Sequence, residues 1–133
     1  MQGKITPKPT VETAPYWEAC RNHELLIQQC STCHHFQFYP RLMCTKCTNR
    51  KMQWKRATGH GTVKSFTIVH RAISKVYQME APYVVALIQL EEGPTMMSNI
   101  IKCNLQAVEI GMKVKVEFET WSESMTVPQF TPV

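Results

Sequence analysis

Four cysteines in two close pairs are the residues of this sequence best suited to chemistry. Two residues separate the members of each pair and ten separate the pairs; the four are Cys30, Cys33, Cys44 and Cys47. A two-residue spacing lets one tight turn direct both sulfurs at one ion, and the ten-residue excursion allows a hairpin to bring the pairs together. Four thiolates in a tetrahedron form the closed shell of structural zinc. The spacing therefore predicts a structural zinc site, with rubredoxin-like iron as the competing interpretation.

The turns around these cysteines depart from a common pattern. A glycine often follows the second cysteine of such a pair, but His34 and Thr48 stand at those positions. We therefore expect somewhat unusual turns. His34 and His35 adjoin a ligand, yet four cysteines already complete the shell. Because that shell leaves no open coordination position, hydrolytic zinc catalysis is not expected.

Candidate catalytic residues are scarce elsewhere in the chain. The sequence contains no Asp, and its ten Glu are not grouped with His in a known motif. Nucleophile elbows, phosphate-binding glycine loops and dinucleotide fingerprints are absent from it. Cys20 and Cys103 stand alone, and a lone cysteine is usually a small buried hydrophobic residue. The sequence therefore assigns no catalytic residue, and it does not identify cofactor-binding residues beyond the metal ligands.

Positive charge is concentrated in the middle of the chain. The formal net charge is +5, and no acidic residue lies between Glu24 and Glu80. Such a field attracts phosphates or an acidic protein surface. An ordinary solvated basic face explains the same charge. The basic residues of this span are Arg41, Lys46, Arg50, Lys51, Lys55, Arg56, Lys64, Arg71 and Lys75.

The length and hydropathy of the chain fit a soluble protein. Its 133 residues suit one domain, or a compact domain with a small appended module. No apolar run approaches the roughly 20 residues that a membrane-spanning helix needs. The first residues lack the basic-then-apolar order of a secretory signal. We expect a cytoplasmic protein without membrane partners.

The pattern predicts a mainly β protein with a short helix at its start. The helix candidate is Pro15–Asn22, and an apolar strand-like run, Leu25–Ile27, opens the cysteine region, which closes near Trp54. Pro15 suits the first turn of a helix. From Thr58 onward the periodicity is that of strands. We place the domains at residues 1–57, helix and ribbon, and 58–133, barrel.

The second half of the chain predicts about five strands and one helical turn. The first strand slips in phase between Val63 and Phe66, which suggests a bulge. The second is nearly continuously apolar, as in a strand buried on both faces. The last contains Pro128, which suggests an edge strand. The strands are expected at Thr62–His70, Tyr83–Leu90, Thr95–Ile101, Lys113–Thr120 and Met125–Phe130, with the helical turn at Asn104–Val108. These elements fit an oligonucleotide/oligosaccharide-binding (OB) fold.

An ordered series of residues resembles one family of small proteins. That family joins a rubredoxin-like zinc ribbon to an OB fold and is encoded with thiolases and related acyl-CoA enzymes. The resemblance covers roughly residues 14 to 132, and the absent glycines after Cys33 and Cys47 are its chief departure. It rests on Tyr16, Trp17, Leu25–Cys30, Cys33, Tyr39–Arg41, Cys44, Cys47, Trp54, Gly59–Val63, Val69–Arg71, Ala81–Ala86, Gly111, Val114–Phe118 and Pro128–Phe130.

The resemblance implies a non-catalytic accessory subunit of an acyl-CoA enzyme complex. Such subunits sit against a thiolase, a hydroxymethylglutaryl-CoA synthase or a hot-dog-fold hydratase and help shape or bridge the CoA-thioester site. The small subunits of benzoylsuccinyl-CoA thiolases, from anaerobic toluene degradation, are similar members. A thiolase-like catalytic subunit is therefore the expected partner, with CoA thioester at the interface and no activity in this chain alone.

One loop is a candidate contact with that partner or with CoA. Between Val69 and Tyr83 the sequence is basic and apolar-tipped, with His70, Arg71 and Lys75, and OB folds often bind ligands through loops. An ordinary exposed loop is an equally open interpretation. A nucleic-acid-binding protein is disfavoured because Phe66 and Tyr83 are the only aromatics of the first two barrel strands. A free-standing CoA-thioester enzyme is disfavoured by the missing catalytic set.

Overall fold

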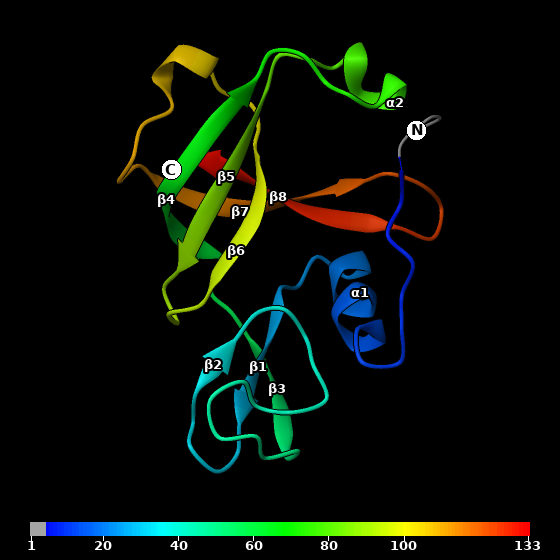
Figure 1. The fold of residues 1–133 in the computed structure, drawn as a ribbon, viewed down its shortest axis with the longest axis vertical. Coiled ribbons are helices and arrows are strands. Elements are labelled where there is room, and N and C mark those ends of the chain that lie inside the picture. The colour runs from blue at the N-terminus through cyan, green and yellow to red at the C-terminus, as the bar shows by residue number, and fades with distance from the viewer. Residues whose placement is uncertain (1–4) are drawn as a thin grey trace.

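The chain forms a small three-stranded sheet below a five-stranded barrel, with one helix beside both (Figure 1). The computed structural model describes residues 5–133. The elements in chain order are α1 Ala14–Arg21, β1 Leu26–Cys30, β2 Phe36–Gln37, β3 Met52–Arg56, β4 His60–Val69, α2 Lys75–Gln78, β5 Tyr83–Leu90, β6 Thr95–Ile100, the 3-10 helix η1 Leu105–Ala107, β7 Lys113–Thr120 and β8 Thr126–Pro132.

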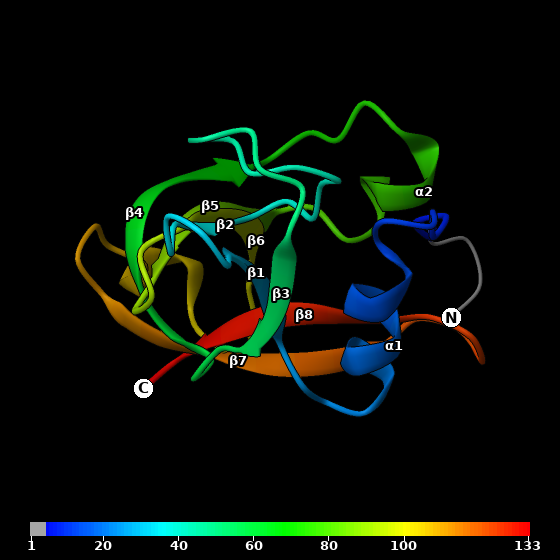
Figure 2. The same ribbon diagram turned by 90° about the horizontal axis from the view of Figure 1, so that it is seen from below.

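The helix α1 begins and ends for local reasons. Pro15 lies in its first turn, where the fixed φ of proline suits a helix and the missing N–H is not needed. His23, just past the end, has a positive φ of 59°, which turns the chain toward β1. The buried residues Tyr16, Ala19 and Cys20 form its inner side. The helix packs against β1 and β8, so it joins the sheet to the barrel (Figure 2).

The small sheet is antiparallel, with β1 between β2 and β3. The register with β3 runs from Leu26 opposite Arg56 to Cys30 opposite Met52, and β2 pairs with β1 through Gln37 opposite Gln28. The sheet therefore holds Cys30 at the end of its central strand.

The barrel closes in the order β4-β5-β6-β8-β7. Closure depends on two junctions, since β4 pairs with β7 at His60 opposite Lys115, and β6 meets β8 in parallel at Ile100 opposite Phe130. The predicted bulge is confirmed between Val63 and Ser65. It follows the segment of β4 that pairs with both neighbours, so the strand can bend around the barrel after leaving β7.

A close backbone approach explains one glycine at the start of β4. A Cβ atom built on Gly61 would lie 2.7 Å from Ile88 Cγ2 and 2.8 Å from the Gln89 carbonyl oxygen. A larger residue would therefore push β4 away from β5.

The core lies inside the barrel and continues to α1 and the base of the small sheet. Phe130, Ile88 and Val114 have no exposed surface, and Tyr16, Cys20, Leu25 and Ile27 join the same cluster. This shared core connects the two halves of the molecule.

Two sequence-based expectations about the strands are wrong. β5 is not buried on both faces: Val84, Ala86, Ile88 and Leu90 point inward, while Leu87 is 37% exposed because its side chain points away from the barrel interior. β8 is not an edge strand, because it pairs with β7 along its length and with β6 at Phe130. Pro128 is accommodated there, and its carbonyl accepts a hydrogen bond of 2.9 Å from the Ser98 hydroxyl.

The other predicted elements match the structure to within a few residues. These are the helix, the opening strand of the cysteine region, β4, β6, β7 and the helical turn, observed as η1. The strands β2 and β3 and the helix α2 were not predicted. Within residues 5–133, no helix is long and apolar enough to cross a membrane.

Candidate functional site

The four cysteines meet at the end of the small sheet farthest from the barrel. Their sulfur atoms all lie within 4.8 Å of one another, and two Sγ–Sγ distances are short: 3.5 Å between Cys30 and Cys47, and 3.6 Å between Cys33 and Cys44. A tetrahedron with zinc–sulfur bonds of about 2.3 Å puts its sulfurs about 3.8 Å apart. The donor set and its spacing therefore fit a tetrathiolate metal site.

Backbone N–H groups surround two of these sulfurs. The first cysteine of each pair accepts hydrogen bonds from the residues two and three positions later. These four bonds, from Thr32 and Cys33 to Cys30 and from Lys46 and Cys47 to Cys44, are 3.3 to 3.5 Å long. Hydrogen bonds, chiefly that of the Cys33 N–H, lower the pKa of the Cys30 thiol to about 6, and the Cys47 N–H is the main cause that lowers the pKa of Cys44. Each turn thus stabilises the thiolate form of the first cysteine of its pair.

The turns keep a regular backbone in spite of their residue types. His34 has φ 64° and Thr48 has φ 66°, the left-handed region that glycine usually occupies. Each donates its N–H over 3.0 Å to the carbonyl of the first cysteine of its pair. The two turns are therefore unusual in their residue types and regular in their backbone. Placing two non-glycine residues in the left-handed region costs steric strain.

Two buried glutamines hold the excursion between the cysteine pairs. Gln28 donates to the Arg41 carbonyl over 2.9 Å and accepts the Arg41 N–H over 2.8 Å. Gln37 donates to Gln28 Oε1 over 2.9 Å and to the Met43 carbonyl over 3.2 Å. Both side chains are only 4% exposed. We call them the glutamine pair; they supply the polar partners that the excursion's backbone would otherwise lack.

The end of the excursion between the cysteine pairs, which we call the apolar tip, is exposed to solvent. Tyr39, Leu42 and Met43 are 59%, 61% and 37% exposed. Sequence reasoning did not identify the glutamine pair, because a glutamine in a strand is normally expected to face water.

The lone cysteines are unsuited to nucleophilic catalysis. Burial raises the pKa of Cys20 to about 12, against a smaller opposing effect of the Tyr16 hydroxyl, and the side chain has no exposed surface. Burial also raises the pKa of Cys103. Both therefore stay as neutral thiols near neutral pH.

The basic loop between β4 and β5 is exposed. His70, Arg71 and Lys75 all face solvent, and α2 is a single turn within this loop. Two large apolar residues of the loop are exposed as well, Ile73 at 100% and Met79 at 95%, whereas Ala72 is buried. The loop is tied to the N-terminal segment by the Ile5 N–H, which donates to the Tyr77 hydroxyl over 3.2 Å.

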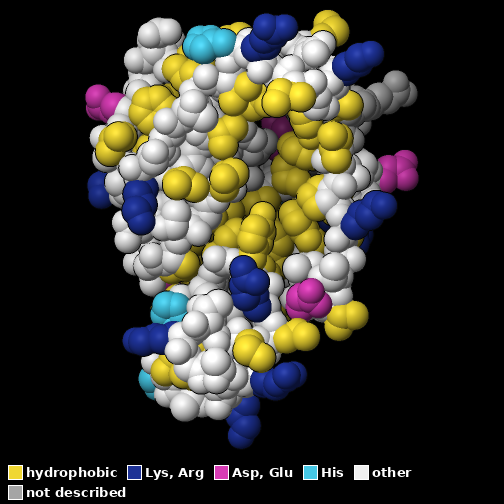
Figure 3. Space-filling view, in the orientation of Figure 1, with side chains coloured by type: hydrophobic (Ala, Val, Ile, Leu, Met, Phe, Trp, Pro, Cys, Tyr) yellow, Lys and Arg dark blue, Asp and Glu magenta, His cyan; other side chains and the backbone are white. Residues whose placement is uncertain are grey.

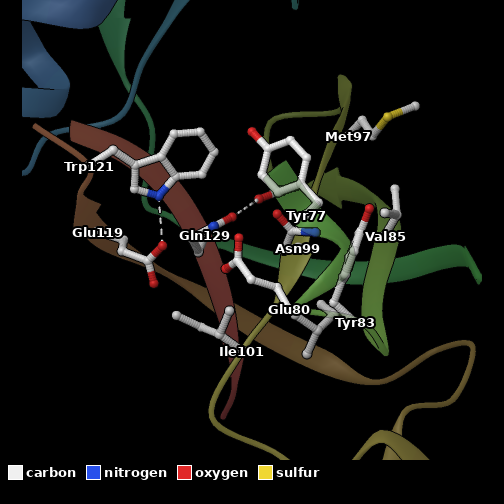
Figure 4. Close-up of a pocket in the computed structure, with 12 residues that line it drawn as sticks. Tyr77, Glu80, Tyr83, Val85, Met97, Asn99, Ile101, Glu119, Trp121 and Gln129 are labelled. Atoms are coloured by element: carbon white, nitrogen blue, oxygen red, sulfur yellow. Dashed lines mark hydrogen bonds between the residues drawn. The ribbon is translucent and has the colours of Figure 1, made fainter. Parts of the chain in front are cut away.

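A pocket of about 400 Å³ lies beside this loop, on the outer face of the barrel. Figure 4 shows Tyr77, Tyr83 and Trp121 around it, with the carboxyl of Glu80 directed toward the side that holds Glu119. Sequence reasoning missed these residues because they come from three separate segments and share no local motif. Figure 3 shows hydrophobic side chains in a hollow in the middle of the face drawn there, above the small sheet.

Known families account for most of the chain. The description "ChsH2, rubredoxin-like zinc ribbon domain" matches residues 17–53, and "ChsH2, C-terminal OB-fold domain" matches residues 54–119. The chain belongs to the ChsH2 (DUF35) family. The ribbon match contains all four cysteines, so the family and the sulfur geometry together support a structural zinc.

Relatives of this ChsH2-family chain have names that refer to scaffolds and to acyl-CoA enzymes. A "DUF35 domain-containing scaffold protein" of Methanocaldococcus jannaschii is 34% identical, over 80% of this chain and 77% of that protein. A "Probable enoyl-CoA hydratase alpha subunit" of Thermomonospora curvata is 30% identical over 96% of this chain. The chain spans only 40% of the length of that subunit.

A solved structure of the family has the same fold. It is titled "Ltp2-ChsH2(DUF35) aldolase" and superposes with a TM-score of 0.85 at 30% identity, covering 95% of this chain and 98% of that chain. The ribbon, the helix and the closed barrel therefore form the common architecture of this ChsH2-family protein.

Within residues 5–133, the four cysteines form the only group of three or more His, Cys, Asp or Glu side chains placed to hold a metal. A closed tetrathiolate offers no open position to a substrate. The metal centre of this ChsH2-family chain is therefore suited to a structural role and not to binding a substrate.

Proposed function

We propose that the protein is a non-catalytic accessory subunit that docks on the catalytic subunit of an acyl-CoA enzyme complex. Three relatives support this proposal by their names, which refer to a scaffold protein, a hydratase alpha subunit and an aldolase. The four cysteines hold a structural zinc, and the reactive groups belong to the partner chain. Cysteines that bind a metal must be reduced and not joined in disulfides. This requirement fits a reducing compartment, which supports a cytoplasmic location.

One observation carries the proposal: large apolar side chains stand in solvent on the loop between β4 and β5. Ile73 is fully exposed and Met79 is 95% exposed, and Met97 on the neighbouring face of β6 is 65% exposed. Burying apolar surface is worth about 25 cal/mol per Å², so a partner that covers these side chains gains free energy.

The finer assignment names a thiolase-type partner that forms or cleaves carbon–carbon bonds, with benzoylsuccinyl-CoA thiolysis as one instance. The resemblance to thiolase-associated subunits supports it. A hot-dog-fold hydratase or a hydroxymethylglutaryl-CoA synthase is the alternative partner, and the hydratase name of one relative favours the former. We keep residues 1–57 and 58–133 as the two proposed domains, since β3 ends at Arg56 and β4 begins at His60.

The basic residues of the loop have a role in this proposal. CoA carries a pyrophosphate and a 3′-phosphate, and Arg71 and Lys75, next to His70, supply a positive field at the mouth of a shared site. A single-stranded nucleic acid is a poorer ligand, because Phe66 packs against the core and is not a free stacking surface.

Co-purification tests the proposal. The tagged chain, isolated from its native source, should retain an acyl-CoA enzyme that mass spectrometry identifies. Replacing Ile73 and Met79 together by Ser should lower the yield of the complex at least tenfold, while Ile110→Ser, a change at a 69% exposed side chain outside this loop, should leave it unchanged. Full acyl-CoA activity of the purified chain alone, or a monomer under all conditions, would refute the proposal.

Charge reversal tests the basic loop separately. Arg71→Glu with Lys75→Glu should weaken binding of CoA thioester to the complex, and the loss should shrink as salt rises because exposed charges are screened. Unchanged complex formation and unchanged CoA affinity would remove the loop from the proposal.

A further inference from the structure

We infer that the open edge of β6 receives an extended apolar segment of the partner polypeptide, which pairs with β6 as an added antiparallel strand. The inference rests on the proposed docking function, and it names the kind of segment that the partner inserts and the way that segment binds.

The strand β6 is paired along one side and only once along the other. It pairs with β5 over its whole length, Thr95–Ile100. Toward β8, the part of the chain that the structure describes forms a single bridge, at Ile100 opposite Phe130. The Ile101 N–H completes this bridge by donating to the Phe130 carbonyl over 2.8 Å. The seam between β6 and β8 therefore opens toward the start of β6.

Pro128 explains why the pairing stops. Backbone groups alternate in direction along a strand, so the Pro128 carbonyl faces β6 as the Phe130 carbonyl does. Proline has no N–H to offer to β6. Its carbonyl accepts a hydrogen bond of 2.9 Å from the Ser98 hydroxyl, so a side chain bridges the two strands where the ladder would continue. The backbone of β6 before Ser98 is therefore left beyond the reach of β8.

The same alternation identifies the backbone groups at this open edge. Leu90 donates its N–H to the Pro94 carbonyl over 2.9 Å, so the even-numbered residues from Pro94 onward direct their backbone groups at β5. The Ile101 N–H, which bonds to β8, shows that the odd-numbered residues face the other way. Thr95 and Met97 therefore direct their N–H and C=O groups at the open edge. Such a row of donors and acceptors is a template for another strand.

The edge has room for a strand beside it. The hollow of Figure 3 lies next to β6, which Figure 1 draws in the same orientation. Two cavities follow one another along β6, one of about 390 Å³ next to Thr95 and one of about 400 Å³ next to Met97–Ile101. An extended chain advances roughly 3.3 Å per residue, so a segment of about three residues spans the open edge.

The side chains beside the edge favour an apolar segment. Met97 is 65% exposed, and Leu87, opposite it on β5, is 37% exposed. The strand β6 contains no charged residue. Every second side chain of an added strand would lie on the same face as Met97 and next to it. Apolar side chains there would gain free energy from burial in addition to the backbone hydrogen bonds.

A segment of a docked partner fits this edge better than a second copy of the chain. A stable interface buries about 800 Å² on each partner, far more than an edge of three residues offers by itself. Two copies would also bring together chains that each carry a net charge of +5. The cavity next to Met97–Ile101 borders the loop between β4 and β5, on which the proposed docking rests. A partner held by that loop is placed to extend a segment along β6.

Amide exchange of the isotope-labelled chain alone tests whether the edge is open. The N–H groups of Thr95 and Met97 should exchange at least about tenfold faster than those of Met96 and Ser98, which face β5. Equal protection of all four would show that the edge is already covered. Protection of Thr95 and Met97 that rises with protein concentration would assign the edge to a second copy. Either result would overturn the inference.

Amide exchange in the co-purified complex tests the occupant. After exchange, quenching and dissociation, Thr95 and Met97 should show exchange slowed at least about tenfold relative to the chain alone, with Met96 and Ser98 little changed. If only the loop between β4 and β5 becomes protected, the inference fails and the docking function stands. If no complex forms, the proposed function fails and the inference fails with it.

Two substitutions at one position separate the backbone from the side chain. Met97→Pro removes an N–H at the open edge, where a strand tolerates proline, whereas Met97→Ala shortens the side chain and keeps the N–H. Met97→Pro should weaken association with the co-purified partner about fivefold more than Met97→Ala, as expected for one lost hydrogen bond. Equal affinities of the two variants would contradict strand pairing. The zinc content and thermal melt of each variant report its fold, and the exchange pattern decides the matter if Met97→Pro does not fold.

Discussion

The ribbon and the barrel of this molecule are stabilised in opposite ways. The ribbon has a two-residue strand, β2, four sulfurs and the glutamine pair, whereas the barrel surrounds a closed apolar core centred on Phe130, Ile88 and Val114. The ribbon's fully buried apolar side chains, Leu25 and Ile27, lie at its base and belong to the barrel's core cluster. The outer half of the ribbon thus depends on ligands and hydrogen bonds, and the rest depends on hydrophobic burial.

Removing the metal should have the largest effect and should separate the two regions. Binding of a structural zinc is worth about 10–16 kcal/mol in isolated peptides, and a core of the barrel's kind does not depend on it. We expect a chelator, or Cys30→Ser, to disorder residues 30 to 50 and to abolish partner activity by loss of the complex, while the barrel stays folded. Amide exchange by NMR measures both regions at once.

The control for metal removal is Cys103→Ser, which changes a thiol that is not part of the cluster. It should retain one zinc per chain by elemental analysis. Barrel amides that lose protection together with the ribbon, or a zinc-free variant that keeps the complex, would contradict the division of stability drawn here.

A cavity in the barrel should give the reverse result. Ile88→Ala removes a side chain with no exposed surface and should lower the free energy of unfolding by about 2–5 kcal/mol. Leu87→Ala, on the exposed face of the same strand, should cost far less. Denaturant melts with zinc bound measure both variants. Equal losses would mean that the outer face of β5 is covered in solution.

Much of this division could be predicted from the sequence. The spacing of the cysteines predicted their meeting point, and the slip between Val63 and Phe66 predicted the bulge, because each is a local pattern with one structural solution. The expectations that β5 is buried on both faces and that β8 is an edge strand were wrong. Both features depend on how the barrel closes, which brings together strands that are far apart in the sequence. Gln28 and Gln37 gave no signal, since a glutamine becomes a structural residue only when a loop folds over it.

The helix that joins the two regions should show a pH dependence of its own. The buried Cys20 thiol has its pKa raised from 9.0 to about 12. In the unfolded chain this thiol loses its proton above pH 9, while the folded chain retains it, so stability falls as pH rises from about 9 to 12. At pH 10 the loss is about 1.4 kcal/mol.

Cys20→Ala should remove this contribution. We expect the difference in unfolding free energy between the parent and the variant to change by about 1.4 kcal/mol between pH 8 and pH 10, measured by urea melts. Cys103→Ala, at a part-exposed thiol, should change less. Parallel pH profiles for the parent and Cys20→Ala would show that the thiol is accessible to water.

The smallest expected effect is a gain in the ribbon. Thr48→Gly relieves a β-branched residue at φ 66° and should stabilise the zinc-bound ribbon by up to about 1 kcal/mol. Thr32→Gly, at an exposed position of the first turn outside the left-handed region, should destabilise it by about 0.5–1 kcal/mol. Competition with a zinc chelator measures both. A loss for Thr48→Gly would show that the threonine side chain stabilises its turn.

The glutamine pair couples the affinity for zinc to the conformation of the exposed apolar tip. Gln37 donates to the carbonyl of Met43, the residue before the ligand Cys44. Met43 is also part of the exposed apolar tip, so the same hydrogen bond holds both the tip and the metal-binding turn in place. Linkage is reciprocal: if zinc fixes the shape of this tip and a partner binds that shape, the partner tightens the hold on zinc by the same factor. Zinc release would then be slower from the assembled complex than from the free chain. When zinc is scarce, chains outside the complex would lose their metal and the fold of the ribbon first.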